Sequence, residues 1–421
     1  MRRTRTVDPR AAAARGLDWL NLTVANIQTG FGPFIASYLT GQGWTQTAIG
    51  FALSLGTITA MASQIPAGAV VDATRRKSRV AGLSLVAFTL SALFLAVSPT
   101  PLFVYLAELL HGFSSCTLGP AIAAMSLALA GRAAFGRRLG RNARFASIGN
   151  GIGAALMGAC GYYISSRAVF YLTAAITLPA LLTLLPLAKR DSAPEPAQET
   201  RLAKPRGREL LKLVLDRRLA VFAICVALFT LANAAMLPLA ASLMTVRAGA
   251  TSSLLIAAAI VLPQAIVAIL SPTIGRLAET RGRRVVLLLG FAMLPIRGVI
   301  LATVGDPTLM VLSQSLDGVS GACFGILVPL VTSDVAAKTG RYNLCLGVVS
   351  FMIGVGSTPS TAIAGMVTDR FGDPAAFIGM AVIGVFGLLL ALVAMPETRP
   401  PAPLRRPAAT SRTDVRIKSP A

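Results

Sequence analysis

Long hydrophobic stretches, separated by short polar or charged breaks, fill most of the chain. An apolar stretch of about 20 residues is long enough to cross a bilayer as an α-helix. Breaks marked by Gly, Pro and charged residues divide the pattern into twelve such stretches, six in each half of the chain. The predicted spans are residues 17–40, 46–71, 79–98, 101–130, 142–166, 168–188, 219–244, 252–274, 284–304, 308–333, 342–367 and 374–395.

This pattern predicts an all-α membrane protein with two pseudo-symmetric halves of six transmembrane helices, at 17–188 and 219–395. The segment between them, 189–218, is rich in Lys, Arg, Pro and Glu, which is typical of a solvated linker. Residues 1–16 are polar and Arg-rich, and residues 396–421 are rich in Pro and Arg. We therefore expect two polar tails outside the membrane.

The composition agrees with a membrane protein. Of the 421 residues, 54% are hydrophobic and only 13% are charged, which is too few charges for the surface of a soluble enzyme. The same numbers exclude a disordered or a fibrous protein. The net charge is +22, but the basic residues form short clusters between hydrophobic stretches and aromatic residues are only 6%, so we expect no nucleic-acid partner.

Lysine and arginine are distributed unevenly between the two sides of the predicted membrane. If the N-terminus is cytoplasmic, 35 of the 39 basic residues lie on the cytoplasmic side, three lie on the other side, and Arg297 lies inside a span. Cytoplasmic loops of membrane proteins carry such an excess of positive charge. We therefore predict a multi-pass protein of the cell (inner) membrane, with both termini and the linker in the cytoplasm.

Two similar loop motifs occupy corresponding positions in the two halves, which indicates an internal duplication. After the second and the eighth spans, a Gly is followed four residues later by an acid and then by basic residues. We expect close helix contact at the Gly and a clasp that controls opening at the cytoplasmic face; the alternative is a positively charged loop and no more. The motif residues are Gly68, Asp72 and Arg76 in the first copy, and Gly275, Glu279 and Arg283 in the second.

At these loops, and in its twelve spans, the sequence resembles the major facilitator superfamily (MFS) from about residue 17 to residue 395. The resemblance implies a transporter whose first, fourth, seventh and tenth spans surround a central cavity, and it says little about the substrate. The pattern is closest to the drug–proton antiporter branch, whose fifth span carries a Gly-rich motif with a Gly-Pro pair. Here the motif is degenerate, because Ala154 and Met157 stand where Pro and Gly are expected.

Four ionisable residues lie at membrane depth, where each costs about 2.5–3.5 kcal/mol on insertion scales. Glu108 and His111 share one face of the fourth span, and His111 is the only histidine in the chain. Since a histidine titrates near neutral pH, we predict a proton-coupling or substrate-binding site; the alternative is a buried pair that only fixes packing. Arg297 and Asp317 are expected to form a structural ion pair, with titration of Asp317 as the functional alternative.

Polar and small residues form a stripe along the first span. Asp18, Asn21 and Gln28 fall on one helical face, and Pro33 can kink the outer part of this helix. We expect Asn21 and Gln28 to line the cavity, whereas Asp18 can be interfacial; interhelical hydrogen bonding is the alternative role of the stripe. Asn233 in the seventh span is a weaker candidate of the same type.

The sequence contains no P-loop, zinc-ligand set, nucleophile elbow or dinucleotide fingerprint, so we expect no enzyme activity, no cofactor and no metal. Without an ATPase module, uphill transport must use an ion gradient, and the available carboxylates and histidine favour protons. Three hypotheses follow: proton-coupled efflux of small amphiphilic compounds by alternating access, proton-coupled import of a specific metabolite, or a transporter-like sensor. We expect a monomer in the lipid bilayer with a small-molecule substrate.

Overall fold

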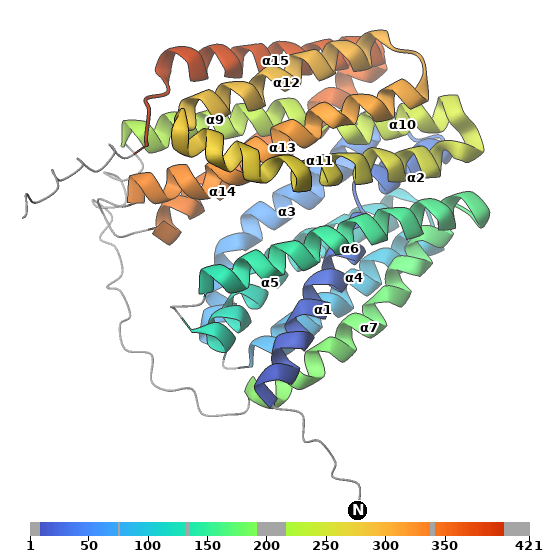
Figure 1. Cartoon of the computed structure of the whole chain (residues 1–421). Helices are drawn as coiled ribbons and strands as arrows, with labels where there is room; N and C mark the ends of the chain where they lie inside the picture. The colour runs from blue at the N-terminus through green and yellow to red at the C-terminus, as the bar shows by residue number, and fades with distance from the viewer. Residues whose placement is uncertain (1–8, 75, 132–134, 192–215, 337–341, 400–421) are drawn as a thin grey trace, which may run out of the picture.

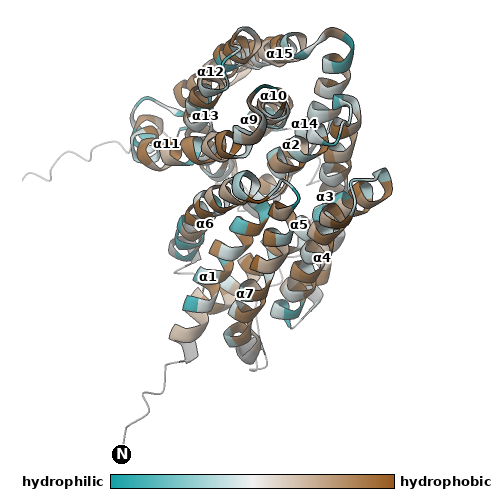
Figure 2. Ribbon diagram, turned by 90° about the vertical axis from the view of Figure 1, so that its right-hand side faces the viewer, coloured by the Kyte–Doolittle hydropathy of each residue, from teal (hydrophilic) through white to brown (hydrophobic). Residues whose placement is uncertain are grey.

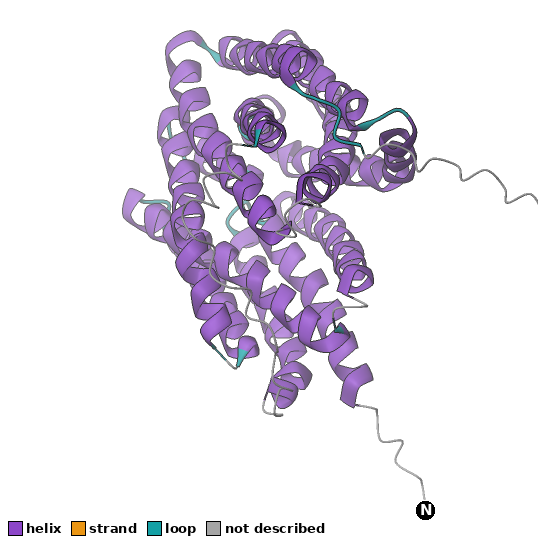
Figure 3. Ribbon diagram, turned by 90° about the vertical axis from the view of Figure 1, so that its left-hand side faces the viewer, coloured by secondary structure: helices purple, strands orange, loops and turns teal. Residues whose placement is uncertain are grey.

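The computed structural model describes residues 9–74, 76–131, 135–191, 216–336 and 342–399 of the chain. Within these ranges the secondary structure is helical, with short connections and no strand (Figure 3). Residues 192–215 of the predicted linker, and residues 1–8 and 400–421 of the predicted tails, lie outside the described residues.

The helices form two bundles, which correspond to the two halves of the sequence (Figure 1). The N-terminal half contains α1 (Pro9–Thr29), α2 (Pro33–Gly41), α3 (Gln46–Ala73), α4 (Lys77–Val97), α5 (Pro101–Ala130), α6 (Phe135–Tyr163) and α7 (Ala168–Asp191). The C-terminal half contains α9 (Arg217–Asn233), α10 (Met236–Ala248), the 3₁₀ turn η2 (Gly249–Thr251), α11 (Ser252–Thr280), α12 (Arg283–Thr303), α13 (Pro307–Ala336), α14 (Tyr342–Phe371) and α15 (Asp373–Ala394).

The first predicted span is two helices rather than one kinked helix. α1 ends at Thr29 and α2 begins at Pro33, and Gly32 between them has a φ of 73° that a residue without a Cβ adopts readily. Pro33 is the first residue of α2, where a missing backbone N–H costs nothing. The seventh predicted span is also broken, between α9 and α10, although Ala234 and Ala235 at this break keep helical backbone angles.

Two further boundaries differ from the sequence prediction. α1 begins at Pro9, so residues 9–16, predicted as part of a polar tail, are helical. α6 begins at Phe135 instead of residue 142, because Arg138 and Arg141 belong to the helix and both bind Asp18 of α1. The charges that mark a loop in the sequence therefore lie within the helix.

Hydrophobic residues run along most of each helix, as the brown parts of the ribbon in Figure 2 show. Large side chains such as Leu83, Leu178 and Val393 are more than half exposed. Eight helical stretches of the described residues are long and apolar enough to cross a membrane, and one of them, Arg217–Thr280, includes α9, α10 and α11. Outward-facing apolar side chains on such helices are what contact with lipid requires.

The interior contains three clusters of buried apolar side chains. One lies within the N-terminal half and one within the C-terminal half. The third joins the halves, since it combines Phe34 and Met157 with Met236 and Met244. The two bundles are thus separate packing units that share a smaller apolar interface.

The halves meet at one end of the bundle, called here the closed end, which contains residues 41–46, 248–252 and 371–373. α2 packs against α10, α3 against α14, and α6 against α11. Ser37 and Thr245 hydroxyls lie 2.6 Å apart across the α2–α10 contact. The Asp369 carboxylate accepts hydrogen bonds from the N–H groups of Gln46 (3.0 Å) and Thr47 (2.6 Å) at the start of α3. This contact suits both partners, because a helix N-terminus attracts an anion.

The opposite end, called here the terminal end, contains the start of α1, the α3–α4 and α11–α12 connections, and residues 395–399. The contacts between the halves described above lie between the closed end and the middle of the helices. Gly50, for example, is the fifth residue of α3, and a Cβ there would collide with the backbone of Thr361. α3 and α14 can approach this closely only because the position is a glycine.

Candidate functional site

Glu108 and His111 lie together in the interior of the N-terminal half, near the start of α5. The His111 Nδ1 atom is 3.4 Å from Glu108 Oε2, a weak contact at the long limit of a hydrogen bond. Glu108 is 1% exposed, and its Oε1 atom has no hydrogen-bond partner among the described residues. A buried carboxylate oxygen without a partner is costly while it carries charge. Binding a proton would remove that cost.

Glycines place this carboxylate against α3. A Cβ at Gly56 would collide with the Glu108 carboxylate, and a Cβ at Gly112 would collide with the backbone of Gly56. α5 therefore crosses α3 at a point where neither helix carries a side chain. The crossing buries Glu108 beneath an apolar backbone surface.

Two phenyl rings enclose the imidazole of His111. The Phe31 ring is stacked on it, with ring centroids 4.2 Å apart and an interplanar angle of 8°. Phe88 of α4 lies at 5.5 Å and is tilted by 56°. Phe31 belongs to the break between α1 and α2, so the histidine touches the first broken helix directly. The sequence reasoning missed this contact, because the break that turns Phe31 toward α5 was not predicted.

The C-terminal half has a polar cluster at the corresponding depth, centred on Arg297 of α12. Arg297 is 1% exposed and donates to Asp317 Oδ1 at 2.7 Å, to Asn233 Oδ1 at 2.6 Å and to Gln314 Oε1 at 2.6 Å. The pair proposed from sequence is therefore in contact. Asn233, proposed as a cavity residue, is part of this cluster. Gln314 completes it and was not singled out from the sequence.

A cavity of about 290 Å³ lies along the wall of the N-terminal half, between α1, α5 and α6. Asn21 and Gln28 line it as the stripe on α1 suggested, and Ser115 and Asn142 add polar groups. The rest of the lining is apolar or small: Val24, Ala25, Leu118, Gly119, Ile122, Ala123, Leu139 and Ala146. The wall is amphiphilic, and none of its lining residues carries a charge.

Asp18 supports this wall from within the protein. It is 2% exposed, and its carboxylate accepts hydrogen bonds from Arg138 (2.7 Å) and Arg141 (2.6 Å) of α6. Arg138 also donates to Asn142 at 2.9 Å, and Asn142 in turn donates to Ser126 of α5 at 2.7 Å. This chain of bonds connects α1, α6 and α5, and it orients the Asn142 amide at the edge of the cavity.

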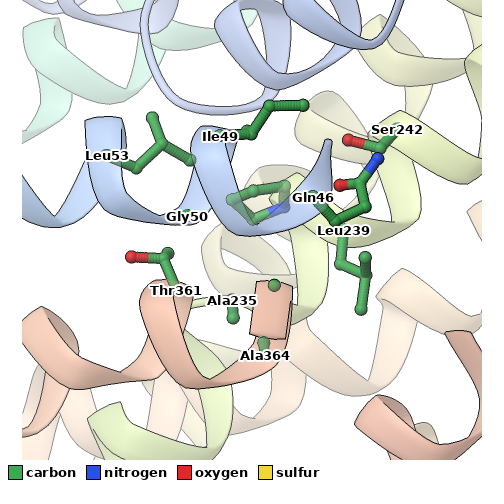
Figure 4. A pocket seen from close by; sticks show the side chains of 11 residues that line it. Gln46, Ile49, Gly50, Leu53, Ala235, Leu239, Ser242, Thr361 and Ala364 are labelled. Carbon is green, nitrogen blue, oxygen red and sulfur yellow. The ribbon is translucent and has the colours of Figure 1, made fainter. Parts of the chain in front are cut away.

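A second, much smaller cavity of about 20 Å³ lies at the closed end, between the halves (Figure 4). Gln46 and Gly50 of α3, Ser242 of α10 and Thr361 of α14 are among its lining. The Ser242 hydroxyl is buried without a partner among the described residues. The space suits one water molecule and is far too small for an organic substrate.

The family model of the major facilitator superfamily matches the chain twice, at residues 19–267 and 222–419. The chain belongs to the major facilitator superfamily. It is 33% identical over 403 residues to an uncharacterized MFS-type transporter of Mycobacterium tuberculosis, an alignment that covers 93% of this chain and 94% of the relative. It is therefore a multi-pass membrane transporter of the MFS kind, with twelve spans in the MFS fold.

Solved structures share the fold at low sequence identity. The nucleoside transporter NupG, in a point-mutant form, has a TM-score of 0.78 at 16% identity and aligns over 91% of this chain and all of its own. A bacterial homologue of the human lysosomal transporter Spinster, inward-facing and unoccupied, has a TM-score of 0.77 at 12% identity, with 93% of this chain and 98% of its own covered. These likenesses concern the fold alone.

The two MFS loop motifs lie at the terminal end. Gly68 and Asp72 are in the last turns of α3, but their surroundings lie outside the described residues; Arg76 is exposed. In the second copy, a Cβ at Gly275 would meet nothing within 4 Å, so the expected close helix contact is absent there. Glu279 is exposed as well.

Arg283 is the one described member of these motifs that is buried and bound by other side chains. Its Nε donates to Asp334 of α13 at 3.1 Å, and its backbone N–H donates to Glu397 at 2.9 Å. The Glu397 carboxylate also accepts from the N–H of Arg284 at 3.2 Å, so it covers the N-terminus of α12. Asp334 and Glu397 were missed from sequence, since neither stands at a motif position.

The degenerate motif of the fifth span serves packing. A Cβ at Gly149 or Gly153 would collide with the α1 backbone, and one at Gly158 with Ala257 of α11. Gly151, by contrast, faces open space. α6 thus lies close against α1 along one part of its length and against the opposite half at the closed end. Met157, where a Gly is expected, is fully buried in the cluster that joins the halves.

Proposed function

We propose that this MFS protein is a proton-coupled exporter of small amphiphilic compounds, in which the proton is held by Glu108 and His111. The observation that carries the proposal is the Glu108 carboxylate, buried, with one oxygen in a 3.4 Å contact with His111 and the other without a partner. Its free energy depends strongly on a proton, because an unpaired charge is costly in a low dielectric. A site of this kind can load and release a proton when its surroundings rearrange.

The amphiphilic wall of the 290 Å³ cavity supports the substrate class. Neutral hydrogen-bonding groups, such as Asn21, Gln28 and Asn142, alternate with aliphatic side chains. The buried cation of the C-terminal half, Arg297, donates to three side chains and is 1% exposed, so it is not accessible to an anionic metabolite. A wall without an anchoring charge favours adaptable binding of amphiphiles over recognition of one charged metabolite.

The direction of transport follows from the proposed orientation. With both termini in the cytoplasm of a cell with an inner membrane, the closed end faces outward, and the protein stands in an inward-facing state with its cavity nearer the cytoplasm. Proton entry from outside would then drive export of the substrate. The pattern agrees with the drug–proton antiporter branch despite the degenerate fifth-span motif, and the protein is proposed to act as a monomer.

Labelling checks this orientation. In a Cys160→Ser background, a cysteine placed at Gly41, at the closed end, should react with an impermeant maleimide added to intact cells. A cysteine at Ser192 in the linker should react only after the membrane is permeabilised. Reaction of both from outside would exclude the proposed topology and, with it, the argument for export.

Reconstituted vesicles test the coupling. Ethidium is a suitable amphiphilic probe, and nucleosides and dipeptides test import, since nucleoside and peptide transporters share the fold. We expect Glu108→Gln to lose uptake driven by a pH gradient, by about tenfold or more, while counterflow without a gradient persists. Asp317→Asn tests the other membrane carboxyl. Because this change breaks the pair with Arg297, its folding is checked by thermal unfolding, and the folded variant should retain the pH response. Wild-type pH-driven transport in Glu108→Gln, or import of a specific nucleoside or dipeptide in place of ethidium efflux, would overturn the proposal.

A further inference from the structure

Phe31 connects the candidate proton site to the break in the first span. Its ring lies flat on His111 at 4.2 Å, and the residue is 4% exposed. It is flanked by Gly30 and by Gly32, whose φ of 73° marks the end of the regular helix. We propose that Phe31 is a positioning residue that couples the protonation of His111 to the angle between α1 and α2. The inference rests on the proposed function, because it assumes that His111 takes part in proton exchange.

The break can act as a hinge. Gly30 and Phe31 donate to Ile27 and Gln28 at 3.2 Å, which is a tighter turn than the α-helix, and regular bonding resumes with Ala36. Few backbone hydrogen bonds would have to be broken for α2 to swing against α1. The stacked His111 ring holds this segment from the side of α5. Gln28, one turn before the break, lines the cavity, so a bound substrate touches the same segment.

The charge state of His111 determines how firmly Phe31 is held. An imidazolium is attracted to the face of an aromatic ring more strongly than a neutral imidazole is. Among the described residues, Glu108 is the charged group in contact with His111. The break between α1 and α2 presents the ring of Phe31, α4 presents the ring of Phe88, and α3 packs its Gly56 backbone beside Glu108. Protonation therefore strengthens both contacts of the imidazole, with the ring and with the carboxylate.

α2 carries this effect to the closed end. It begins two residues after Phe31, and its Ser37 lies 2.6 Å from Thr245 of α10. With His111 protonated, the break is held and α2 stays against α10, so the closed end remains closed. Once the proton leaves, the break loosens and α2 can move away from α10. Proton release and opening at the closed end are thus linked, as export by antiport requires.

A cross-link reports on the closed end. The Ser37 and Thr245 oxygens are close enough for cysteines there to form a disulfide, whose sulfurs lie about 2.0 Å apart. The pair Ser37→Cys and Thr245→Cys would be made with Cys160, the partly exposed native cysteine, replaced by Ser. The thiols are oxidised with added copper phenanthroline, and this reaction is itself slower at low pH because the thiolate is the reacting form. Each rate is therefore divided by the rate of the same cysteine pair in a His111→Gln background. We expect this ratio in lipid nanodiscs to be about threefold larger near pH 5.5 than near pH 8.5. Each single cysteine variant controls for other thiols.

Three substitutions separate the ring from general packing. Phe31→Leu and Phe31→Met remove the stacked face and should make the normalised cross-linking rate independent of pH. Phe88→Leu makes the same chemical change beside the same histidine but outside the break, and it should keep the pH response. Using both Phe31 variants guards against one that does not fold.

Magnetic resonance of labelled histidine distinguishes failure of the proposed proton site from failure of the proposed role of Phe31. His111 is the only histidine, so its signal needs no assignment. If His111 does not titrate between about pH 5 and about pH 9 in the wild type, the proposed proton site itself is wrong. If it titrates in the wild type and in Phe31→Leu, and cross-linking in both Phe31 variants still follows pH as in the wild type, then Phe31 does not couple the site to the hinge.

Discussion

The two halves place polar residues at the same point of their folds but give them different numbers of hydrogen-bond partners. In the N-terminal half α5 crosses α3 at Gly112, and in the C-terminal half α13 crosses α11 at Gly318, where a Cβ would meet Pro263 and Ile266. Glu108 lies one turn before Gly112, and Gln314 lies one turn before Gly318. The duplication therefore preserved the crossing and changed the chemistry beside it.

The difference lies in how many partners each charged group has. The Arg297 guanidinium donates to three side chains at 2.6–2.7 Å. The Glu108 carboxylate has one contact at 3.4 Å and one oxygen without a partner. Among the described residues the Arg297 Nε atom has no partner, but a group held by three short bonds resists rearrangement more than a group with one weak contact. We infer that the C-terminal half serves as a rigid frame and the N-terminal half carries the responsive site.

The largest effect on stability should come from breaking the Arg297 cluster. Arg297→Leu leaves Asp317 without its cation and removes the partner of Asn233 and Gln314. Loss of one member of a buried pair costs about 3–5 kcal/mol. We expect a large fall in the thermal unfolding temperature of the detergent-solubilised protein. Glu108→Gln, at the corresponding place in the N-terminal half, should lower the unfolding temperature far less. An equal fall in the two variants would contradict the proposed difference between the halves.

Most of the architecture could be predicted from the sequence. Spans of about 20 apolar residues and turn residues between them are local signals, and they define the helices that the structure contains. The depths of Glu108 and Arg297, and the helical face shared by Asn21 and Gln28, follow from the same local spacing. In the first span only a kink at Pro33 was predicted, and the break in the seventh span was missed, because hydrophobicity continues through both.

The parts that could not be predicted depend on contacts between distant segments. Arg138 and Arg141 have the same sequence signature as any cytoplasmic loop, and only the fold brings them to Asp18. The stacking of Phe31 on His111 needs the break, and the bonds of Glu397 need the end of α15 to return to α12. A pattern of residues along the chain contains none of this information.

Substitutions in the loop motifs at the terminal end should have an effect of intermediate size, on transport. If they form a clasp when that end closes, Asp72→Asn should weaken a contact specific to that state by about 1–3 kcal/mol, the usual size of a coupling energy. Transport should fall while expression and folding persist. Glu279→Gln, the equivalent change in the other half, shows whether both copies contribute. Wild-type turnover in vesicles for both variants would reduce the motifs to positively charged loops.

The smallest effect on stability is expected at the terminal end of the C-terminal half, where the Glu397 carboxylate covers the N-terminus of α12. Burial acts to raise the pKa of this carboxyl, but the backbone N–H groups of Arg399, Arg283, Arg284 and Thr398 together lower its pKa below the ordinary value. The folded protein therefore prefers the ionised form. The stabilisation is fully present above the ordinary glutamate pKa of about 4.3 and is lost as the pH falls through the lowered value.

Glu397→Gln should accordingly reduce stability at pH 7 by less than about 1 kcal/mol, since the exposed side of the carboxylate is screened by solvent. Thermal unfolding in detergent between about pH 3 and about pH 7 measures this loss, and the difference from wild type should shrink toward the acid end. Glu279→Gln removes an exposed carboxylate near the same end and should leave the unfolding temperature unchanged across that range. If Glu397→Gln kept the pH profile of the wild type, the N-terminus of α12 would be held by Asp334 and Arg283 alone. The stability of the C-terminal half would then not depend on the charge of Glu397.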